Sequence, residues 1–531
     1  MVNGYLYTGP LPLGSVVAHN CGAAGLFSDK INPEVILEAH EVEGLYTLTV
    51  TIGDSVQIFE GPVSSMGRRQ IGQALLRYLR EYQGLPAEAP WGTMVGVRPT
   101  KLLHKYIDTY GSVHAATRHI RDEFSVSIEK LATLGAIGEY QRPFLSDTDD
   151  KKVSLYCGIP FCDTRCVYCS FPYGLYQDYA GKSQFLKALT RDIEDMKAIV
   201  QSYNLTVNTL YMGGGTPTVL KDEDFHQVLK QLSLLVPEGH EFTVEAGRPD
   251  SVNPTKLRSM LALGVNRISI NPQTMQDDIL RRIGRGHSVR DIDELLQYVK
   301  NNTSLAVNMD FIAGLPNQTM LNMIENMDYV CQNLPENVTI HTLALKRGSP
   351  LYDLHMEDDI PEEHLVAEMV QYGKERLEAA GYVPYYLYRQ QYMRGQLENI
   401  GYTLPGKACE YNIQIMEERQ SILSMGPGSS SKWMRAPEYR QLKQHMPKDV
   451  DVYHETIDAL LDTVIITKNK AKSIVDCPVW IPRSAFRNTI RHNKTTTPTI
   501  LFSFPNKILK IVTNKKQNTI VTAIFTKYTS I

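Results

Sequence analysis

The sequence lacks any apolar run long enough to cross a membrane, and it carries little net charge. No window approaches the roughly 18 uninterrupted apolar residues of a membrane helix, so we expect no membrane span. The formal net charge of −3 over 531 residues gives no reason to expect nucleic acid or an anionic membrane as a partner. Apolar residues make up 43% and charged residues 21%, as in a soluble globular protein, and the length predicts two or three domains.

The first 28 residues contain no Lys, Arg, Asp or Glu. A secretory signal peptide needs a basic start followed by a continuous apolar stretch, but here the basic start is missing and Gly and Pro interrupt the apolar stretch. We therefore expect a cytoplasmic protein. In a reducing cytosol, clustered cysteines indicate metal or redox chemistry rather than disulfides.

Residues 465–531 contain no glycine and one acid, Asp476, against twelve Lys or Arg. This tail therefore carries +11, and the remainder of the chain carries −14. It lacks the dense basic runs and the aromatic pattern of a nucleic-acid-binding arm. Its alternating stretches favour strands without clear turns, so we expect a poorly ordered extension that is distinct in character from the body.

The body divides by its periodicity. Residues 1–150 predict an N-terminal α+β domain, with a hairpin over 44–60 and an amphipathic helix over 66–83. From 151 to 384, six short apolar runs alternate with helical segments, which predicts a parallel sheet curled into a barrel or part of one. Residues 385–464 follow as a smaller C-terminal segment. On such a fold, chemistry belongs at the carboxyl ends of the strands.

Cysteine is scarce, yet four of the eight cysteines fall between Cys157 and Cys169. Cys162, Cys166 and Cys169 form a CxxxCxxC loop directly after the first strand of the barrel. Three thiolates suit an iron–sulfur cube and would leave one iron open to a substrate. Structural zinc, which wants four ligands, is the alternative, but Cys157 lies inside the predicted strand.

Polar and glycine residues recur at the ends of the next strands. Met212–Thr218 (MGGGTPT) closes the second strand with consecutive glycines, which let a ligand approach the backbone. Further polar side chains follow at the third, fourth and fifth strands, namely Glu245, Arg267, Ser269, Gln273, Arg285 and Asp310. Together they predict one pocket for a polar, charge-bearing molecule.

These motifs resemble the radical S-adenosylmethionine (SAM) superfamily. The CxxxCxxC loop, GGGTPT and GLPNQT carry this resemblance. GVRPTK, PYYLYRQ and ENIGYTLPGKACEYN further resemble the HemZ branch of the oxygen-independent coproporphyrinogen III oxidase (HemN-type) group. The resemblance covers roughly residues 90–460. It implies a partial (β/α)6 TIM-like radical SAM barrel flanked by α+β segments.

The resemblance also implies cofactors and their contacts. Cys162, Cys166 and Cys169 would hold a [4Fe–4S] cluster whose open iron binds SAM. The residues that match SAM contacts are Tyr156, Tyr168, Gly214, Gly215, Thr216, Glu245, Gln273, Arg285, Asp310 and Ala344. No further catalytic residue is assigned. A one-electron reductant such as flavodoxin or ferredoxin would be the protein partner, and a porphyrinogen or haem would be the small-molecule substrate.

The implied reaction converts coproporphyrinogen III to protoporphyrinogen IX. Reductive cleavage of SAM gives a 5′-deoxyadenosyl radical, which abstracts hydrogen from a propionate, and loss of CO2 and an electron leaves a vinyl group. Cys169 is followed by Ser170 and Phe171, where the decarboxylases have a further cysteine. Because the haem chaperones of the HemW type also show CxF, a SAM- and cluster-binding haem chaperone is the alternative function.

Overall fold

The computed structural model describes residues 4–457 and the backbone of three strands beyond them, at 499–504, 507–514 and 519–527. The gaps within 4–457 are 88, 95–97, 146–148, 171–173, 346–347, 354–358, 390–396 and 436–438. Phe171 and part of the GVRPTK motif therefore lie outside the described residues. Within the described residues, no helix is long and apolar enough to cross a membrane.

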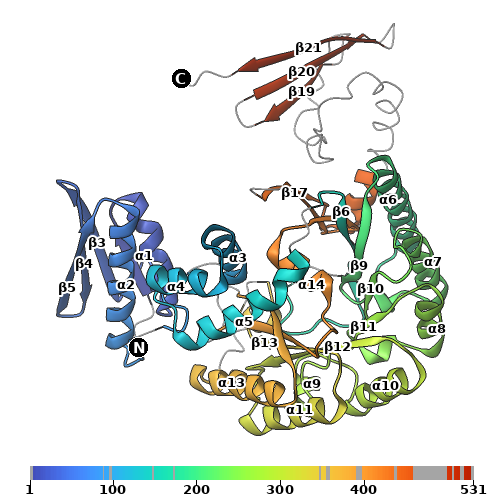
Figure 1. Cartoon of the computed structure of the whole chain (residues 1–531), viewed down its shortest axis with the longest axis horizontal. Helices are drawn as coiled ribbons and strands as arrows, with labels where there is room; N and C mark the ends of the chain where they lie inside the picture. The colour runs from blue at the N-terminus through green and yellow to red at the C-terminus, as the bar shows by residue number, and fades with distance from the viewer. Residues whose placement is uncertain are drawn as a thin grey trace.

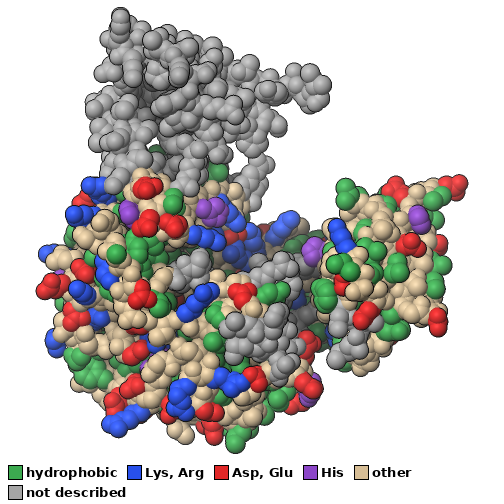
Figure 2. Space-filling view, turned by 180° about the vertical axis from the view of Figure 1, so that it is seen from behind, with side chains coloured by type: hydrophobic (Ala, Val, Ile, Leu, Met, Phe, Trp, Pro, Cys, Tyr) green, Lys and Arg blue, Asp and Glu red, His purple; other side chains and the backbone are tan. Residues whose placement is uncertain are grey.

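The N-terminal part is a five-stranded sheet backed by two helices. Its strands are β1 (Gly4–Thr8), β2 (Phe27–Ser28), β3 (Val35–Val42), β4 (Leu45–Ile52) and β5 (Ser55–Pro62), and its helices are α1 (Leu11–Ala23) and α2 (Ser65–Tyr82). The strand order is β2-β1-β3-β4-β5. The predicted hairpin is confirmed, with Gly53 at positive φ in its turn, and so is the predicted amphipathic helix, whose N-cap is Ser64. In Figures 1 and 2 this part forms a lobe beside the barrel.

Three helices connect this lobe to the barrel. They are α3 (Pro99–Tyr110), α4 (Val113–Phe124) and α5 (Ile128–Leu145). The sheet, α1 and α2 have a hydrophobic core of their own, which ends at Ala89. The buried side chains of α3–α5, with Trp91, belong instead to the core of the barrel. These helices thus pack as part of the barrel, although they fall within the N-terminal segment expected to end at residue 150.

The predicted partial barrel is confirmed. Six consecutive parallel strands lie in chain order, namely β6 (Lys152–Ile159), β9 (Thr206–Gly214), β10 (Glu241–Glu245), β11 (Arg267–Ser269), β12 (Ala306–Ala313) and β13 (Asn337–Thr342). Their helices form the outer crescent in Figure 1: α6 (Lys182–Ser202), α7 (Asp222–Ser233), α8 (Pro254–Ala262), α9 (Asp277–Arg282), α10 (Val289–Asn302), α11 (Met320–Asn333) and α13 (Glu363–Ala379). Five short elements lie between them, namely β7 (Phe161–Cys162), β8 (Gly174–Leu175), α12 (Pro350–Asp353) and two 3-10 turns at Pro217–Val219 and Pro249–Ser251. The strands read as nearly continuous apolar runs because both of their faces are covered.

The C-terminal segment extends the sheet at both edges. β14 (Val383–Tyr388) and β15 (Asn399–Thr403) add beyond β13, and β16 (Ser421–Met425), β17 (Ser430–Arg435) and β18 (Arg440–His445) add beyond β6. Between them, α14 (Glu410–Glu417) lies on the inner side of the crescent with α3 and α5. The sheet is therefore an open arc of eleven strands among the described residues, and no strand closes it into a barrel.

Part of the basic tail forms a separate antiparallel sheet of β19 (Thr499–Phe504), β20 (Lys507–Asn514) and β21 (Thr519–Lys527). These are the stretches whose alternation favours strands. Residues 458–498 lie outside the described residues, so the expected poor order of the tail stays a prediction.

Candidate functional site

The cysteine loop begins where β6 ends. Cys162, Cys166 and Cys169 are each partly exposed, whereas Cys157 is fully buried inside β6, as the sequence predicts. The loop is held by its backbone, since the Cys169 N–H donates to the Cys166 carbonyl over 3.1 Å. The Thr164 hydroxyl donates to the Gly284 carbonyl over 2.7 Å. The loop is therefore anchored on the segment that follows α9.

The glycine segment after β9 lies directly against the start of this loop. The Gly215 and Thr216 N–H groups donate over 2.7 Å to the carbonyls of Ile159 and Phe161 respectively. A Cβ added at Gly215 would lie 2.2 Å from the Phe161 carbonyl oxygen, so this approach requires glycine. The Thr216 hydroxyl donates to the Cys162 sulfur over 3.6 Å. Burial raises the pKa of the Cys162 thiol to about 11, and the hydrogen bond from Thr216 opposes that rise.

Glu245 ends β10 with its carboxylate turned back toward the glycine segment. The Tyr211 hydroxyl donates to it over 2.8 Å and the Gly214 N–H over 3.1 Å. A Cβ on Gly213 would lie 2.7 Å from its Oε2 atom. Burial raises the pKa of Glu245 to about 7; the negative charge of Asp310 adds to the rise, and the two hydrogen bonds oppose it. The site thus holds a carboxyl group that titrates near neutrality.

Arg285 fastens the cysteine loop to two strand ends. Its Nη1 donates to the carbonyls of Gly247 (3.0 Å) and Asn271 (2.7 Å), and its Nη2 donates to the Tyr168 hydroxyl (3.1 Å). Its Nε is buried and has no hydrogen-bond partner among the described residues. Two residues that match SAM contacts, Arg285 and Tyr168, therefore contact each other directly.

Gln273 and Asp310 meet at the neighbouring strand ends. The Gln273 N–H donates to the Asp310 carbonyl over 2.8 Å, and Gln273 has a φ of +70°, a conformation that costs energy for any residue other than glycine. The Asp310 carboxylate lies 3.6 Å from Nε2 of His341, whose Nδ1 lies 3.1 Å from the Tyr388 hydroxyl. The strained backbone of Gln273 is typical of functional sites. Ala344 lies half-buried just beyond β13, with no described contact that gives it a role.

A stack of three tyrosines lies on the inner face of the sheet. Tyr156 from β6 and Tyr211 from β9 are stacked, and Tyr411 from α14 is stacked on both, with its ring centroid 4.7 Å from that of Tyr211. Only Tyr156 was singled out from the sequence. Tyr211 has a local signal, because it lies two residues before the glycine run on the same strand face as Gly213. Nothing local identifies Tyr411, since α14 is 165 or more residues beyond β10 in the chain.

Glu241, at the start of β10, holds the first turn of α14. Its carboxylate accepts the N–H groups of Glu410 (2.8 Å) and Tyr411 (3.0 Å) and the thiol of Cys409 (3.3 Å). A carboxylate on a helix N-terminus is stabilising because free N–H groups and the positive end of the helix dipole meet it there. Cys409, to which the sequence assigns no role, is thus a fully buried structural residue that helps to place Tyr411.

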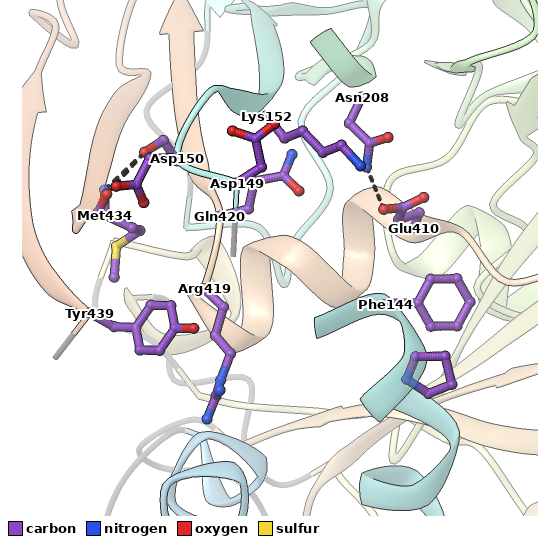
Figure 3. A pocket seen from close by; sticks show the side chains of 12 residues that line it. Phe144, Asp149, Asp150, Lys152, Asn208, Glu410, Arg419, Gln420, Met434 and Tyr439 are labelled. Carbon is purple, nitrogen blue, oxygen red and sulfur yellow. Dashed lines mark hydrogen bonds between the residues drawn. The ribbon is translucent and has the colours of Figure 1, made fainter. Parts of the chain in front are cut away.

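A cavity of about 280 Å3 lies at the opposite end of the strands. Figure 3 shows Lys152, Asn208 and Glu410 facing it, and the first of these begins β6. None of the residues predicted from the sequence for the site lines this cavity. The chemistry predicted from the sequence therefore belongs to the other end of the sheet.

The donor set fits an iron–sulfur cluster. Three thiols lie on one loop, and iron–sulfur clusters are held by cysteine thiolates. The Thr216 hydroxyl donates to one of the three sulfurs, and the glycine segment packs closely beside it. Among the described residues, no group of three or more His, Cys, Asp or Glu side chains is arranged to hold a single metal ion. The assignment of the three cysteines therefore rests on their spacing and on the family.

The fold and the cysteine loop define the class. Residues 156–330 match the model of the radical SAM superfamily, whose members use a [4Fe–4S] cluster and SAM. The chain is 34% identical over 404 residues to the oxygen-independent coproporphyrinogen-III oxidase-like protein HemZ of Bacillus subtilis, covering 75% of this chain and 80% of that protein. This chain therefore belongs to the HemZ family of coproporphyrinogen oxidase-like radical SAM proteins.

Two other likenesses are more distant. The haem chaperone HemW of Bacillus subtilis is 29% identical over 43% of this chain and 60% of its own length. Coproporphyrinogen III oxidase HemN of Escherichia coli, a radical SAM enzyme of known structure, matches with a TM-score of 0.48 and 21% identity, over 58% of this chain and 69% of its own.

Proposed function

We propose that this protein is an oxygen-independent coproporphyrinogen III dehydrogenase, which decarboxylates two propionates oxidatively to vinyl groups and yields protoporphyrinogen IX. The observation that carries the proposal is the three-thiol loop at the carboxyl end of β6, joined by Thr216 to the glycine segment of β9. The 34% identity to a relative named coproporphyrinogen-III oxidase-like, over 80% of its length, supports the porphyrinogen as substrate.

In this proposal Cys162, Cys166 and Cys169 hold the cluster. When bound, the cluster and SAM supply the radical that abstracts hydrogen. The residues proposed to contact SAM are Tyr156, Tyr168, Gly214, Gly215, Thr216, Glu245, Gln273, Arg285, Asp310 and Ala344. The reaction takes place in the cytoplasm, where the seven free cysteines of the described chain stay reduced.

The protein's own residues bind and orient. Glu245 offers a carboxylate to a cationic ligand, and its pKa of about 7 leaves it partly ionised at neutral pH. Arg285 holds Tyr168, and with it the cysteine loop, against the strand ends. The stack of Tyr156, Tyr211 and Tyr411 supplies aromatic surface beside Glu245, which accepts a hydrogen bond from the Tyr211 hydroxyl.

A haem chaperone is the second candidate, favoured by the 29% identity to a HemW protein and by the CxF sequence that ends at Phe171. In that case the protein would bind SAM and the cluster without decarboxylating a porphyrinogen. The two functions can be distinguished because only the dehydrogenase converts propionates to vinyl groups.

The test is an anaerobic assay of the reconstituted protein with coproporphyrinogen III, SAM and a reductant. Porphyrins are then oxidised and separated, and methionine and 5′-deoxyadenosine are quantified. The proposal requires vinyl products in proportion to the SAM that is cleaved. SAM cleavage without vinyl products, together with tight haem binding, assigns the chaperone function instead. Bound zinc with no reducible cluster excludes both.

A further inference from the structure

A basic groove of about 690 Å3 lies on the outer side of the barrel, between the first half of α6, the start of α7 and Tyr176. Four cations line it, Lys182, Lys187, Arg191 and Lys221, against two acids, Glu194 and Asp224. The groove therefore carries a net positive charge, whereas residues 1–464 as a whole carry a net charge of −14. None of these residues belongs to the motifs that define the family.

The groove lies one hydrogen bond from the cysteine loop. The Tyr176 N–H donates to the Cys162 carbonyl over 3.0 Å, and β8, which Tyr176 follows, pairs with β7, which contains Cys162. The Phe161 ring packs edge-on against Tyr176 and Phe185, with centroids 5.4 and 5.0 Å apart. A path of covalent bonds, ring contacts and a single hydrogen bond thus joins the groove to a proposed cluster ligand.

Two lysine side chains of the groove have no intramolecular partner among the described residues. Lys187 and Lys221 are exposed, and neither has an ion pair or a side-chain hydrogen bond within the described part of the chain. Lys182, by contrast, donates to the Gln177 carbonyl and lies over the Tyr176 ring. Exposed and unpaired cations at the rim of a groove steer an oppositely charged partner and contribute little to stability.

We propose that this groove docks an acidic one-electron carrier protein, which reduces the cluster through the β7–β8 pair. The proposal rests on the proposed function, because the electron that the carrier donates is accepted by the proposed cluster. One electron leaves the reduced carrier and enters the cluster, so the carrier is oxidised and the cluster reduced by one electron, and no atom is transferred. The cations of α6 alone extend from Lys182 to Arg191, about 14 Å along the helix at ~1.5 Å per residue, which matches a protein surface rather than a small anion.

The test compares Lys187→Glu/Lys221→Glu with a control of equal charge, Lys30→Glu/Lys105→Glu, in which both lysines are exposed and remote from the groove. A purified flavodoxin serves as the acidic probe. Its affinity for the reconstituted protein, with both partners oxidised and kept anaerobic, is measured by calorimetry at two salt concentrations. We expect about tenfold or greater weakening in the groove variant at low salt, a smaller salt dependence, and no more than a twofold change in the control.

Reduction kinetics separate this inference from the proposed function. In the reconstituted groove variant, reduction of the cluster by reduced flavodoxin slows about tenfold, whereas dithionite, which is small, reduces it to the wild-type extent. Carbodiimide cross-linking of flavodoxin to the wild-type protein should yield peptides that contain Lys187 or Lys221, and this readout needs no variant. Equal binding by the groove and control variants, or cross-links elsewhere, overturns the inference. A protein that dithionite cannot reduce overturns the proposed function instead.

Discussion

Glu245 is a half-buried carboxyl whose pKa is raised to about 7, so its ionisation should control the binding of a cationic ligand. Its pKa is raised from 4.5 to about 7, mainly by burial. SAM carries a sulfonium and an ammonium group, and an ionised Glu245 beside the glycine segment attracts them, whereas the neutral acid does not. Binding of SAM should therefore strengthen as the pH rises through 7.

The size of the effect follows from the titration. A carboxyl with a pKa of about 7 is about one-tenth ionised at pH 6 and about nine-tenths ionised at pH 8. If SAM binds only to the ionised form, its affinity rises about tenfold over this range, or ~1.4 kcal/mol. Equilibrium dialysis of SAM against the anaerobic, reconstituted protein at pH 6, 7 and 8 measures it.

Two variants test the assignment to this carboxyl. Glu245→Gln keeps the shape but cannot ionise, so it should bind SAM weakly and equally at the three pH values. Tyr211→Phe keeps the stacked ring but removes the hydroxyl that donates to Glu245 over 2.8 Å. Because that hydrogen bond lowers the pKa of Glu245, the midpoint should move to higher pH. A pH dependence that survives in Glu245→Gln would refute the reasoning.

Three further predictions concern the cysteine loop, the glycine segment and the ion pairs of Glu418. Cys169→Ala should abolish the absorption of the reconstituted cluster, whereas Cys157→Ala, inside β6, should retain it. Gly215→Ala forces a Cβ to 2.2 Å from a carbonyl oxygen of β7 and should lower the thermal midpoint and the cluster content, whereas Gly22→Ala, which meets no atom within 4 Å, should change neither. Glu418→Ala leaves three cations without the carboxylate that pairs them and should cost about 3 kcal/mol, read as a lower thermal midpoint. Those cations hold the pKa of Glu418 below its usual range. In the wild-type protein this stabilisation is therefore present above pH ~4.5 and lost as the pH falls. A Glu418→Ala protein as stable as the wild type at pH 7 would contradict this prediction.

The strands and their order could be predicted from the sequence because parallel strands covered on both faces are short, continuous apolar runs. The predicted apolar runs at 153–157, 207–213 and 305–312 coincide with β6, β9 and β12 within one or two residues at each end. Carboxyl ends of neighbouring parallel strands meet at one edge, so the polar residues after each run could be grouped without coordinates. This rule alone predicts that the thiol loop, the glycine segment and Glu245 lie at the same edge of the sheet.

Contacts across the sheet could not be predicted in the same way. The pKa of Glu245 depends on Tyr211, 34 residues earlier, and on burial, neither of which a local pattern reports. The resemblance implies that Arg285 contacts SAM, yet three hydrogen bonds of its guanidinium go to two carbonyls and Tyr168. A strand-end residue can serve the site by holding another residue in place, and sequence position does not distinguish that role from ligand binding.

The helices before the barrel and the segment after it act as one structural unit around the sheet. Glu398 of the C-terminal segment is buried, accepts the Trp91 indole N–H over 2.6 Å and pairs with Lys130 of α5. Gln141 of α5 donates both to the Tyr385 carbonyl and to Glu417 of α14. A buried carboxylate that loses its partners costs several kcal/mol, so each segment requires the other. Because Glu417 ends the helix that begins beside Tyr411, its contact with Gln141 of α5 helps to fix the tyrosine stack beside Glu245. A chain that begins near residue 150 would lack α5 and with it part of the support of the candidate site.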